Sequence, residues 1–218
     1  SPLQPPLFRL VAILQRHHDP LQRPQHGEAD DQRQRHEDDE MHPHRRFVLQ
    51  LGPEGGAKHK VKPLYNVIAT GGGPGIMEAA NRGAYDAGAP SIGYNITLPM
   101  EQEPNAFSTP DLTFRFHYFA MRKMHLAMRA AALVVFPGGF GTMDELFELL
   151  TLRQTGKMTK PLPVVLFDSA FWKRTINFRS FVDGGLISER DLGLFTFADT
   201  PEQAWDALLA AGLPVPKD

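Results

Sequence analysis

Apolar and polar residues follow one another along this chain in blocks that predict strands and helices in turn. Short apolar runs that end in glycine or proline are typical of buried strands, and apolar residues spaced three and four apart predict helices. The expected strands cover 66–70, 91–95, 132–136, 163–167 and 194–197. The expected helices cover 76–87, 118–131, 142–154, 170–183 and 201–211. This alternation predicts an α/β fold, a Rossmann-like parallel sheet with helices on both faces.

The first 44 residues differ in composition from the rest. Residues 7–14 are apolar enough for one short strand or helix, but Ala29 is the only apolar side chain between Gln22 and Glu40. Six of the nine histidines lie between His17 and His44, at irregular spacing, and no metal site is predicted there. Residues 1–44 are therefore expected to form a polar, His-rich segment that is solvated or disordered, and 45–218 to form the folded domain.

A glycine-rich turn joins the strand at 132–136 to the helix that follows it. Its sequence is Phe136-Pro-Gly-Gly-Phe-Gly-Thr-Met-Asp-Glu145. At such a junction, free backbone N–H groups and the positive end of the helix dipole favour a phosphate. Asp144 and Glu145 are expected in the first helical turn. There they either cap the helix or act chemically on a phosphate-bearing ligand.

A second glycine turn, Gly71-Gly-Gly-Pro-Gly75, follows the strand at 66–70. It lacks the glycine spacing of the dinucleotide fingerprint and the Gly-Lys-Ser/Thr of a P-loop. Two phosphate-compatible turns at neighbouring strand ends predict one ligand the size of a mononucleotide, bound above the edge of a parallel sheet.

Three motifs, taken in order, resemble the LOG ("Lonely guy") family of nucleoside 5′-monophosphate phosphoribohydrolases, whose members often carry the label lysine decarboxylase. The motifs are Gly71-Gly-Gly-Pro-Gly-Ile-Met-Glu-Ala-Ala-Asn-Arg-Gly-Ala84, Met121-Arg-Lys-Met124 and Pro137-Gly-Gly-Phe-Gly-Thr-Met-Asp-Glu145. The resemblance runs from about Arg45 to Leu213. It makes 45–218 a nucleotide-binding domain of this type.

The resemblance implies hydrolysis of AMP, or of an N6-modified AMP such as a cytokinin riboside monophosphate, to free base and ribose 5-phosphate. It implies a homodimer or larger homo-oligomer and no cofactor. Glu145 matches the family's catalytic carboxylate and Arg122 its functional arginine. The residues expected to bind substrate and its phosphate are Gly72, Gly73, Gly75, Met77, Lys123, Gly138, Gly139, Gly141 and Thr142.

The residues themselves support these roles. Cleavage of an N-glycosidic bond builds positive charge on the ribose, and a carboxylate can stabilise that charge or activate water. Asp144 lies one residue from Glu145, about 100° around a helix, so the two carboxylates cannot point at one atom. Arg122 offers a planar fork for phosphate or ribose oxygens.

The chain departs from the family at its first strand. Relatives usually open the domain with a strand that ends in a Gly-Ser-Ala/Ser-Arg-like turn, which helps to line the nucleotide site. Here the apolar residues 10–14 lead into Gln15-Arg-His-His18 instead. This departure favours an alternative in which the protein binds or carries a nucleotide or cofactor without hydrolysing it, as molybdenum-cofactor carrier proteins of similar fold do.

Composition narrows the remaining function classes. The chain has 218 residues, a formal net charge of −2 and no cysteine. Neither nucleic acid nor an anionic membrane is an implied partner, and disulfides and thiolate metal sites are excluded. No apolar run approaches the roughly 18 residues of a membrane span, and the first residues lack a signal-peptide pattern, so the cytoplasm is expected. A pyridoxal-dependent decarboxylase would need a buried lysine, whereas Lys157 and Lys160 fall in a polar loop.

Overall fold

A computed structural model describes residues 11–16, 66–97, 103–128, 130–158 and 160–213. The described strands are β1 (Val11–Arg16), β2 (Asn66–Thr70), β3 (Ser91–Ile96), β4 (Thr113–Phe116), β5 (Ala130–Val135), β6 (Val164–Phe167) and β7 (Thr196–Ala198). The described α-helices are α1 (Ile76–Asp86), α2 (Phe119–Met128), α3 (Phe140–Gln154), α4 (Ser169–Thr175), α5 (Phe178–Asp183) and α6 (Pro201–Ala210). Short 3-10 helices cover η2 (Pro110–Leu112) and η3 (Glu189–Leu194).

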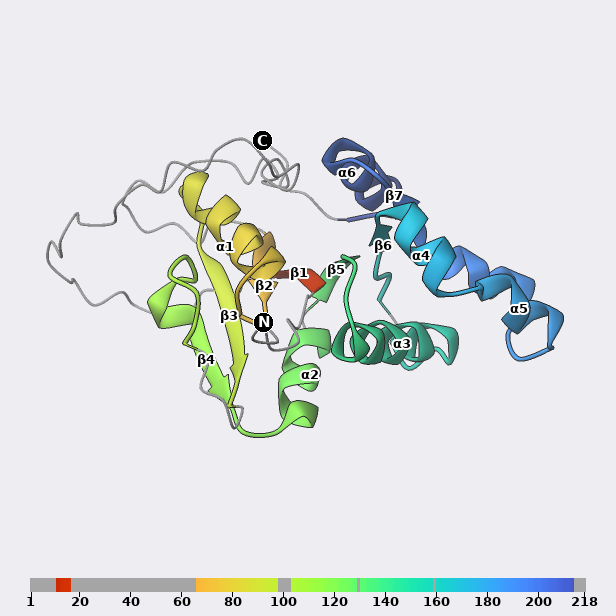
Figure 1. The fold of residues 1–218 in the computed structure, drawn as a ribbon, viewed down its shortest axis with the longest axis horizontal. Helices are drawn as coiled ribbons and strands as arrows, with labels where there is room; N and C mark the ends of the chain where they lie inside the picture. Colours follow the sequence, from red (N-terminus) through yellow and green to blue (C-terminus); the bar gives the residue numbers. More distant parts are fainter. Residues whose placement is uncertain (1–10, 17–65, 98–102, 129, 159, 214–218) are drawn as a thin grey trace, which may run out of the picture.

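The described strands form a single mixed sheet in the order β4-β3-β2-β1-β5-β6-β7. β2, β3 and β4 are parallel, and so are β5, β6 and β7. β1 lies between the two groups and runs antiparallel to both β2 and β5. The prediction of an α/β parallel sheet is therefore confirmed, with the central strand as the exception to its direction. Figure 1 shows the sheet running from β4 at one side to β7 at the other.

Both faces of the sheet are buried because successive side chains on each strand point to opposite sides. Val67, Leu133 and Val164 belong to one apolar core, and their chain neighbours Ile68, Val134 and Val165 belong to the other. The first core is covered by residues of α2, α3, α4 and α5, and the second by residues of α1 and α6. Helices on both faces are thus confirmed (Figure 1).

The last helix begins and ends as the sequence predicts. The Thr200 hydroxyl accepts a hydrogen bond from the Gln203 N–H at 3.2 Å, and Pro201 occupies the first turn. Gly212, with φ of 90°, follows the end of α6. This is the combination of a polar N-cap, an early proline and a terminal glycine that the sequence signals indicate.

The single helix expected over 170–183 is wrong, because the structure contains two helices there. α4 ends at Thr175, Ile176 is extended, and the Asn177 side chain caps α5 by accepting from the Ser180 N–H. Trp172 and Phe178 are both buried in the same core. On one straight helix these two residues would lie about 120° apart, so the break allows both rings to face the sheet.

Two other strands differ from the expectation. β4 was not predicted; it is a short edge strand that pairs with β3. β1 lies within the segment 1–44, in the apolar stretch where a strand or helix is expected. The rest of that predicted polar segment lies outside the described residues, so the expectation that it is solvated or disordered stays a prediction.

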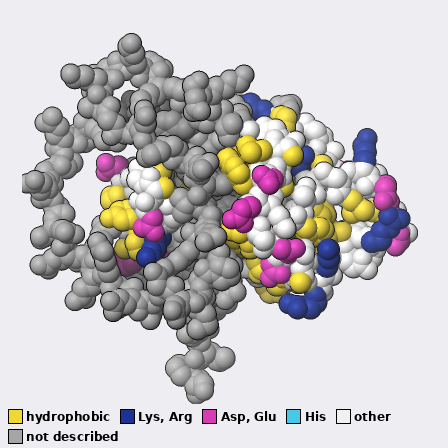
Figure 2. Space-filling view, turned by 90° about the horizontal axis from the view of Figure 1, so that it is seen from above, with side chains coloured by type: hydrophobic (Ala, Val, Ile, Leu, Met, Phe, Trp, Pro, Cys, Tyr) yellow, Lys and Arg dark blue, Asp and Glu magenta, His cyan; other side chains and the backbone are white. Residues whose placement is uncertain are grey.

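No helix in the described ranges is long and apolar enough to cross a membrane. On the face seen from above, lysine, arginine and acidic side chains of the described residues are interspersed among apolar ones (Figure 2). The described part of this face therefore carries no continuous basic area of the kind that nucleic acids require.

Candidate functional site

Both glycine turns lie at the same edge of the sheet. β2 and β5 each run antiparallel to β1, so they are parallel to each other and their carboxyl ends share one edge. After β2, the next strands β3 and β4 are added on one side of the sheet. After β5, the next strands β6 and β7 are added on the other side. Ligands of open α/β sheets bind at such a reversal of strand order, outside the carboxyl ends of the strands.

A buried network of polar side chains holds the first turn. The Gly72 N–H donates to Thr70 Oγ1 at 2.9 Å, and the Thr70 hydroxyl donates to Asn81 Oδ1 at 2.6 Å. Asn105 Nδ2 donates both to Asn81 Oδ1 and to the Gly73 carbonyl. Asn81 is fully buried and serves this network. The glycine turn is thus braced from α1 and from the loop that contains Asn105.

Gly72 and Gly75 have φ of 71° and 76°, a region that other residues rarely adopt. A side chain at Gly72 would also meet Asn95, because a Cβ built there lies 2.0 Å from Asn95 Oδ1. A Cβ at Gly75 would meet nothing within 4 Å. The backbone conformation therefore favours glycine at both positions, and the Asn95 side chain leaves no room for a Cβ at Gly72.

The helices that follow the two glycine turns have no side-chain cap. α1 begins after Gly75 and α3 after Gly139, and neither N-terminus receives a side-chain hydrogen bond. By contrast, side chains of Asp168, Asn177 and Thr200 cap α4, α5 and α6. The backbone N–H groups at the start of α1 and α3 thus lack the side-chain acceptor that the other three helices possess.

α3 begins earlier than the sequence predicts, and this moves the two carboxylates. The helix starts at Phe140, so Asp144 and Glu145 lie in its second turn and the first turn contains no acidic residue. The expectation that they occupy the first turn is wrong, because Gly139, not Gly141, is the N-cap. Neither carboxylate therefore caps the start of α3.

Glu145 meets Arg122 across the contact between α3 and α2. Arg122 Nη2 lies 3.6 Å from Glu145 Oε1, and both residues are buried, with relative exposures of 5% and 8%. Within the described residues, the buried side-chain atoms without a hydrogen-bond partner are Asn95 Oδ1, Arg122 Nε and Glu145 Oε2. The ion pair thus keeps unused hydrogen-bonding capacity on both of its members, which is uncommon inside proteins.

Burial raises the pKa of Glu145 to about 7, although the Arg122 guanidinium opposes the rise. Burial likewise lowers the pKa of Arg122 from its ordinary value, against the attraction of Glu145. A carboxyl group that titrates near neutrality, beside a buried arginine, is characteristic of functional sites.

The other predicted residues are distributed as follows. Thr142 is buried in the first turn of α3, and Met77 is buried in the core with Val67 and Ala69. Lys123 Nζ lies 3.0 Å from Asp144 and 3.1 Å from Glu148, so its ammonium group already faces two carboxylates. The roles of Lys123, Met77, Thr142 and Gly72, Gly73, Gly75, Gly138, Gly139 and Gly141 in substrate binding stay predictions.

The direction of β1 bears on the Gly-Ser-Ala/Ser-Arg-like turn that the sequence lacks after its first strand. Because β1 is antiparallel, its carboxyl end at Arg16 pairs with Asn66, at the start of β2. Its amino end at Val11 pairs instead with Val135, next to the second glycine turn. The carboxyl end of β1 therefore lies at the opposite edge of the sheet from the two glycine turns.

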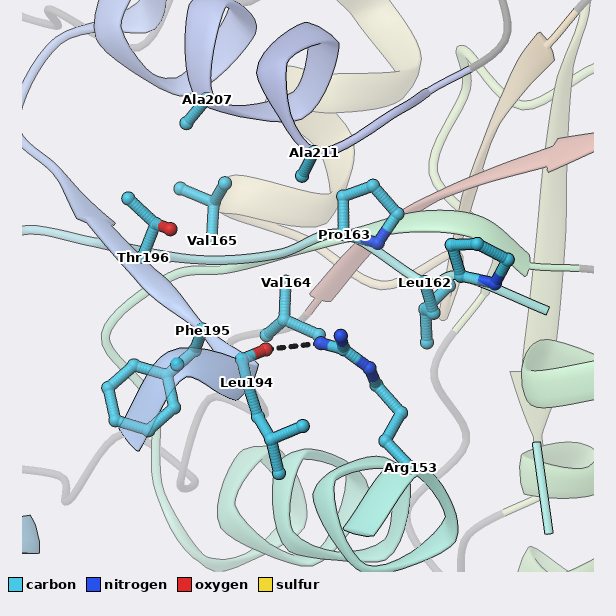
Figure 3. A pocket seen from close by; sticks show the side chains of 12 residues that line it. Arg153, Leu162, Pro163, Val164, Val165, Leu194, Phe195, Thr196, Ala207 and Ala211 are labelled. Atoms are coloured by element: carbon cyan, nitrogen blue, oxygen red, sulfur yellow. Dashed lines mark hydrogen bonds between the residues drawn. The ribbon is translucent and has the colours of Figure 1, made fainter. Parts of the chain in front are cut away.

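A small cavity of about 60 Å³ lies at that opposite edge (Figure 3). It is lined by the first residues of β6 and β7, by the end of α6 and by Arg153, whose guanidinium donates to the Leu194 carbonyl. Its position at the amino ends of the strands separates it from the glycine turns. It is not part of the candidate site.

Comparison with known proteins shows the family. The family described as "Possible lysine decarboxylase" matches residues 77–208, which is more than half of the chain. The chain belongs to this family, the LOG family. A rice (Oryza sativa subsp. japonica) protein described as probable cytokinin riboside 5′-monophosphate phosphoribohydrolase LOG4 is 26% identical over 144 residues, covering 65% of this chain. The chain spans 61% of the length of that relative.

The chain is also similar to two further proteins. The Arabidopsis thaliana cytokinin riboside 5′-monophosphate phosphoribohydrolase LOG2 is 26% identical over 134 residues, which cover 61% of this chain and 62% of that protein. The X-ray structure of TM1055 matches with a TM-score of 0.47 and 24% identity, over 64% of this chain and 75% of that one.

The lysines that the structure describes do not fit the label lysine decarboxylase. A pyridoxal-dependent decarboxylase needs a lysine that can become neutral to form a Schiff base. Lys157, Lys160 and Lys173 are exposed, and the contacts of Lys123 raise its pKa despite its partial burial. Within the described ranges, decarboxylation therefore has no suitable lysine.

Sequence reasoning missed the residues that brace the first turn. Thr70 and Asn105, which hydrogen-bond to this turn, and Asn95, which lies against Gly72, were not assigned roles. Thr70 directly precedes the glycines, which is a signal that was available. Asn95 and Asn105 are distant from this turn in sequence, and only the folded chain brings them to Gly72.

We expect Gly72→Ala to lower the free energy of unfolding by about 2 kcal/mol or more, because it adds a clash with Asn95 to the strain of a positive φ. Gly75→Ala is the matched control: it has the same strain without the clash, and should lower the free energy by about 1 kcal/mol. Urea unfolding followed by circular dichroism measures both. Equal losses would show that Asn95 yields to a side chain at Gly72.

Proposed function

We propose that this protein hydrolyses the N-glycosidic bond of a purine-type nucleoside 5′-monophosphate, such as AMP or N6-modified AMP. Water adds to C1′ of the ribose, the bond to the base breaks, and a proton goes to the departing base. The products are the free base and ribose 5-phosphate. The description of the rice and Arabidopsis relatives as cytokinin riboside 5′-monophosphate phosphoribohydrolases supports this reaction class.

The observation that carries the proposal is the buried pair Arg122–Glu145, with Arg122 Nε and Glu145 Oε2 lacking hydrogen-bond partners among the described residues. A buried charge pair without complete hydrogen bonding is unfavourable for stability by itself. A bound ligand that hydrogen-bonds to Arg122 Nε and Glu145 Oε2 would supply the missing partners. The uncapped starts of α1 and α3 support an anionic ligand in the same way.

In this mechanism the phosphate is bound by Gly139, Gly141 and Thr142 at the start of α3. Gly72, Gly73 and Gly75 border the ribose or the base. Arg122 holds phosphate or ribose oxygens through its planar guanidinium. Glu145, in its ionised form, stabilises the positive charge that develops on the ribose or takes the proton of the attacking water.

The state of Glu145 predicts how activity depends on pH. With a pKa of about 7, its carboxyl group is mostly protonated below neutral pH and ionised above it. Because the mechanism uses the carboxylate, kcat/KM should rise with pH through a midpoint near 7. This dependence reports the free enzyme.

The alternative is a protein that binds a nucleotide without hydrolysis. The direction of β1 favours it, since the carboxyl end of this strand lies at the opposite edge of the sheet from both glycine turns. The buried Arg122–Glu145 pair favours hydrolysis. A thermal-shift screen with nucleotides, run beside an assay for released base, separates the two: stabilisation by AMP without base release would support the alternative.

We expect the wild-type protein to release adenine from AMP and Glu145→Gln to release none above background. The substitution keeps the shape and removes the charge, so AMP should bind as well or better as repulsion from its phosphate falls. Chromatography of the free base measures turnover, and Glu202→Gln, exposed on α6, is the control. Adenosine should be a far poorer substrate than AMP. Undiminished turnover in Glu145→Gln would contradict the assignment.

Arg122→Lys keeps the positive charge but loses the two-pronged grip of the guanidinium. We expect turnover to fall roughly 10-fold or more, about 1.4 kcal/mol of transition-state stabilisation. Arg174→Lys, exposed on α4, should leave turnover unchanged. If both substitutions have the same small effect, Arg122 is not part of the reaction.

We also expect a homodimer or larger homo-oligomer that uses the outer surface of α2. This helix exposes several large apolar side chains, and Phe140, the first residue of α3, is 95% exposed. The α2 residues are Phe119, Met121, Met124 and Met128. Met121→Glu should shift the mass measured by light scattering toward the monomer, whereas Leu209→Glu on α6 should not. A monomeric wild-type protein would contradict this expectation.

A further inference from the structure

Two adjacent ion pairs join α2 to α3 at the candidate site. Arg122 and Lys123 are consecutive on α2, and they meet Glu145 and Asp144, which are consecutive on α3. The Arg122 pair is buried. The pair of Lys123 with Asp144 is more exposed, because 21% of the lysine side chain is accessible to solvent. Lys123 also reaches Glu148, one turn further along α3, at 3.1 Å. Figure 1 shows the two helices that these contacts connect.

The geometry of Lys123 differs from that of an ordinary surface lysine. Asp144 and Glu148 are four residues apart and therefore lie on one face of α3, so a single ammonium group bridges both. An exposed pair contributes little by itself, but a bridge between two carboxylates restricts how α3 can shift or rotate against α2. The same contacts turn Lys123 away from the N-terminus of α3, because both partners lie beyond its first turn.

The charges around Glu145 divide into two signs. Burial opposes its ionisation most strongly, and the negative charges of Asp144 and Glu148 act in the same direction. The positive charges of Arg122 and Lys123 oppose them. Lys123 therefore affects Glu145 twice: by its own charge and by neutralising the two carboxylates that would disfavour an ionised Glu145.

We propose that Lys123 is a positioning residue which, through Asp144 and Glu148, holds α3 against α2 and keeps Glu145 charged at Arg122. This inference rests on the proposed function for its catalytic consequence. It differs from the expectation that Lys123 contacts the phosphate of the substrate. In the folded chain its ammonium group is engaged by two carboxylates, and a phosphate at the start of α3 would meet backbone N–H groups instead.

The test compares Lys123→Gln, Lys123→Arg and Asp144→Asn with the wild type. We expect Lys123→Gln to move the midpoint of the kcat/KM profile upward by roughly half a pH unit, and Asp144→Asn to move it downward by a similar amount. Lys123→Arg should retain the wild-type midpoint. The KM for AMP should change less than about 2-fold in all three variants. Lys160→Gln, an exposed lysine in the loop after α3, is the control for loss of one positive charge.

A second readout does not depend on turnover. Carboxyl ¹³C resonances of labelled glutamate report the titration of Glu145 directly, with Glu145→Gln as the assignment control. The same opposite shifts should appear there. A protein that releases no base but shows these shifts would overturn the proposed function and leave the role of Lys123 standing.

Two results would overturn the inference. A KM for AMP raised about 10-fold in Lys123→Gln, with an unmoved midpoint, would make Lys123 a phosphate ligand. Equal losses of activity in Lys123→Gln and Asp144→Asn, with no shift of either titration, would reduce the contact to an ordinary surface ion pair.

Discussion

The buried contact between Arg122 and Glu145 is the constraint on which the candidate site depends. Removing two charges from water costs several kcal/mol for each ion, and their attraction compensates only when the remaining donors and acceptors are satisfied. Here Arg122 Nε and Glu145 Oε2 have no partner among the described residues. The two apolar cores and the packing of α2 and α3 must therefore tolerate a polar contact that stability alone does not favour.

The glycine turns show the same conflict between stability and binding. α1 and α3 would be more stable with a polar side chain at the N-cap, as α4, α5 and α6 have. A glycine at that position leaves the backbone N–H groups open to a ligand. Hydrogen bonds of Thr70, Asn81 and Asn105 hold the first glycine turn in place and supply rigidity that the glycines lack. Rigid support beneath an open turn suits recognition of an anion.

Much of the fold was predictable because strands buried on both faces leave a simple signal. The runs that became β5 and β6 are wholly apolar, and those that became β2 and β3 are apolar apart from a few polar residues. The positions of these four strands differ from expectation by at most two residues. Elements that depend on distant contacts were harder. β4 needs β3 as its partner, and the break between α4 and α5 follows from the need to bury both Trp172 and Phe178 in one core.

The sequence by itself determined the family, the alternation of strands and helices, and the candidates Arg122 and Glu145, because these depend on residue types at fixed local spacing. Tertiary structure decided where those residues lie and which partners they meet. It started α3 at Phe140, which placed Asp144 and Glu145 beyond the capping turn, and it assigned Asp144 to Lys123 and Glu145 to Arg122. It also made β1 antiparallel to its neighbours β2 and β5. The physical reason is that burial, charge pairing and strand direction arise from segments far apart in the chain, which meet only when the sheet has formed.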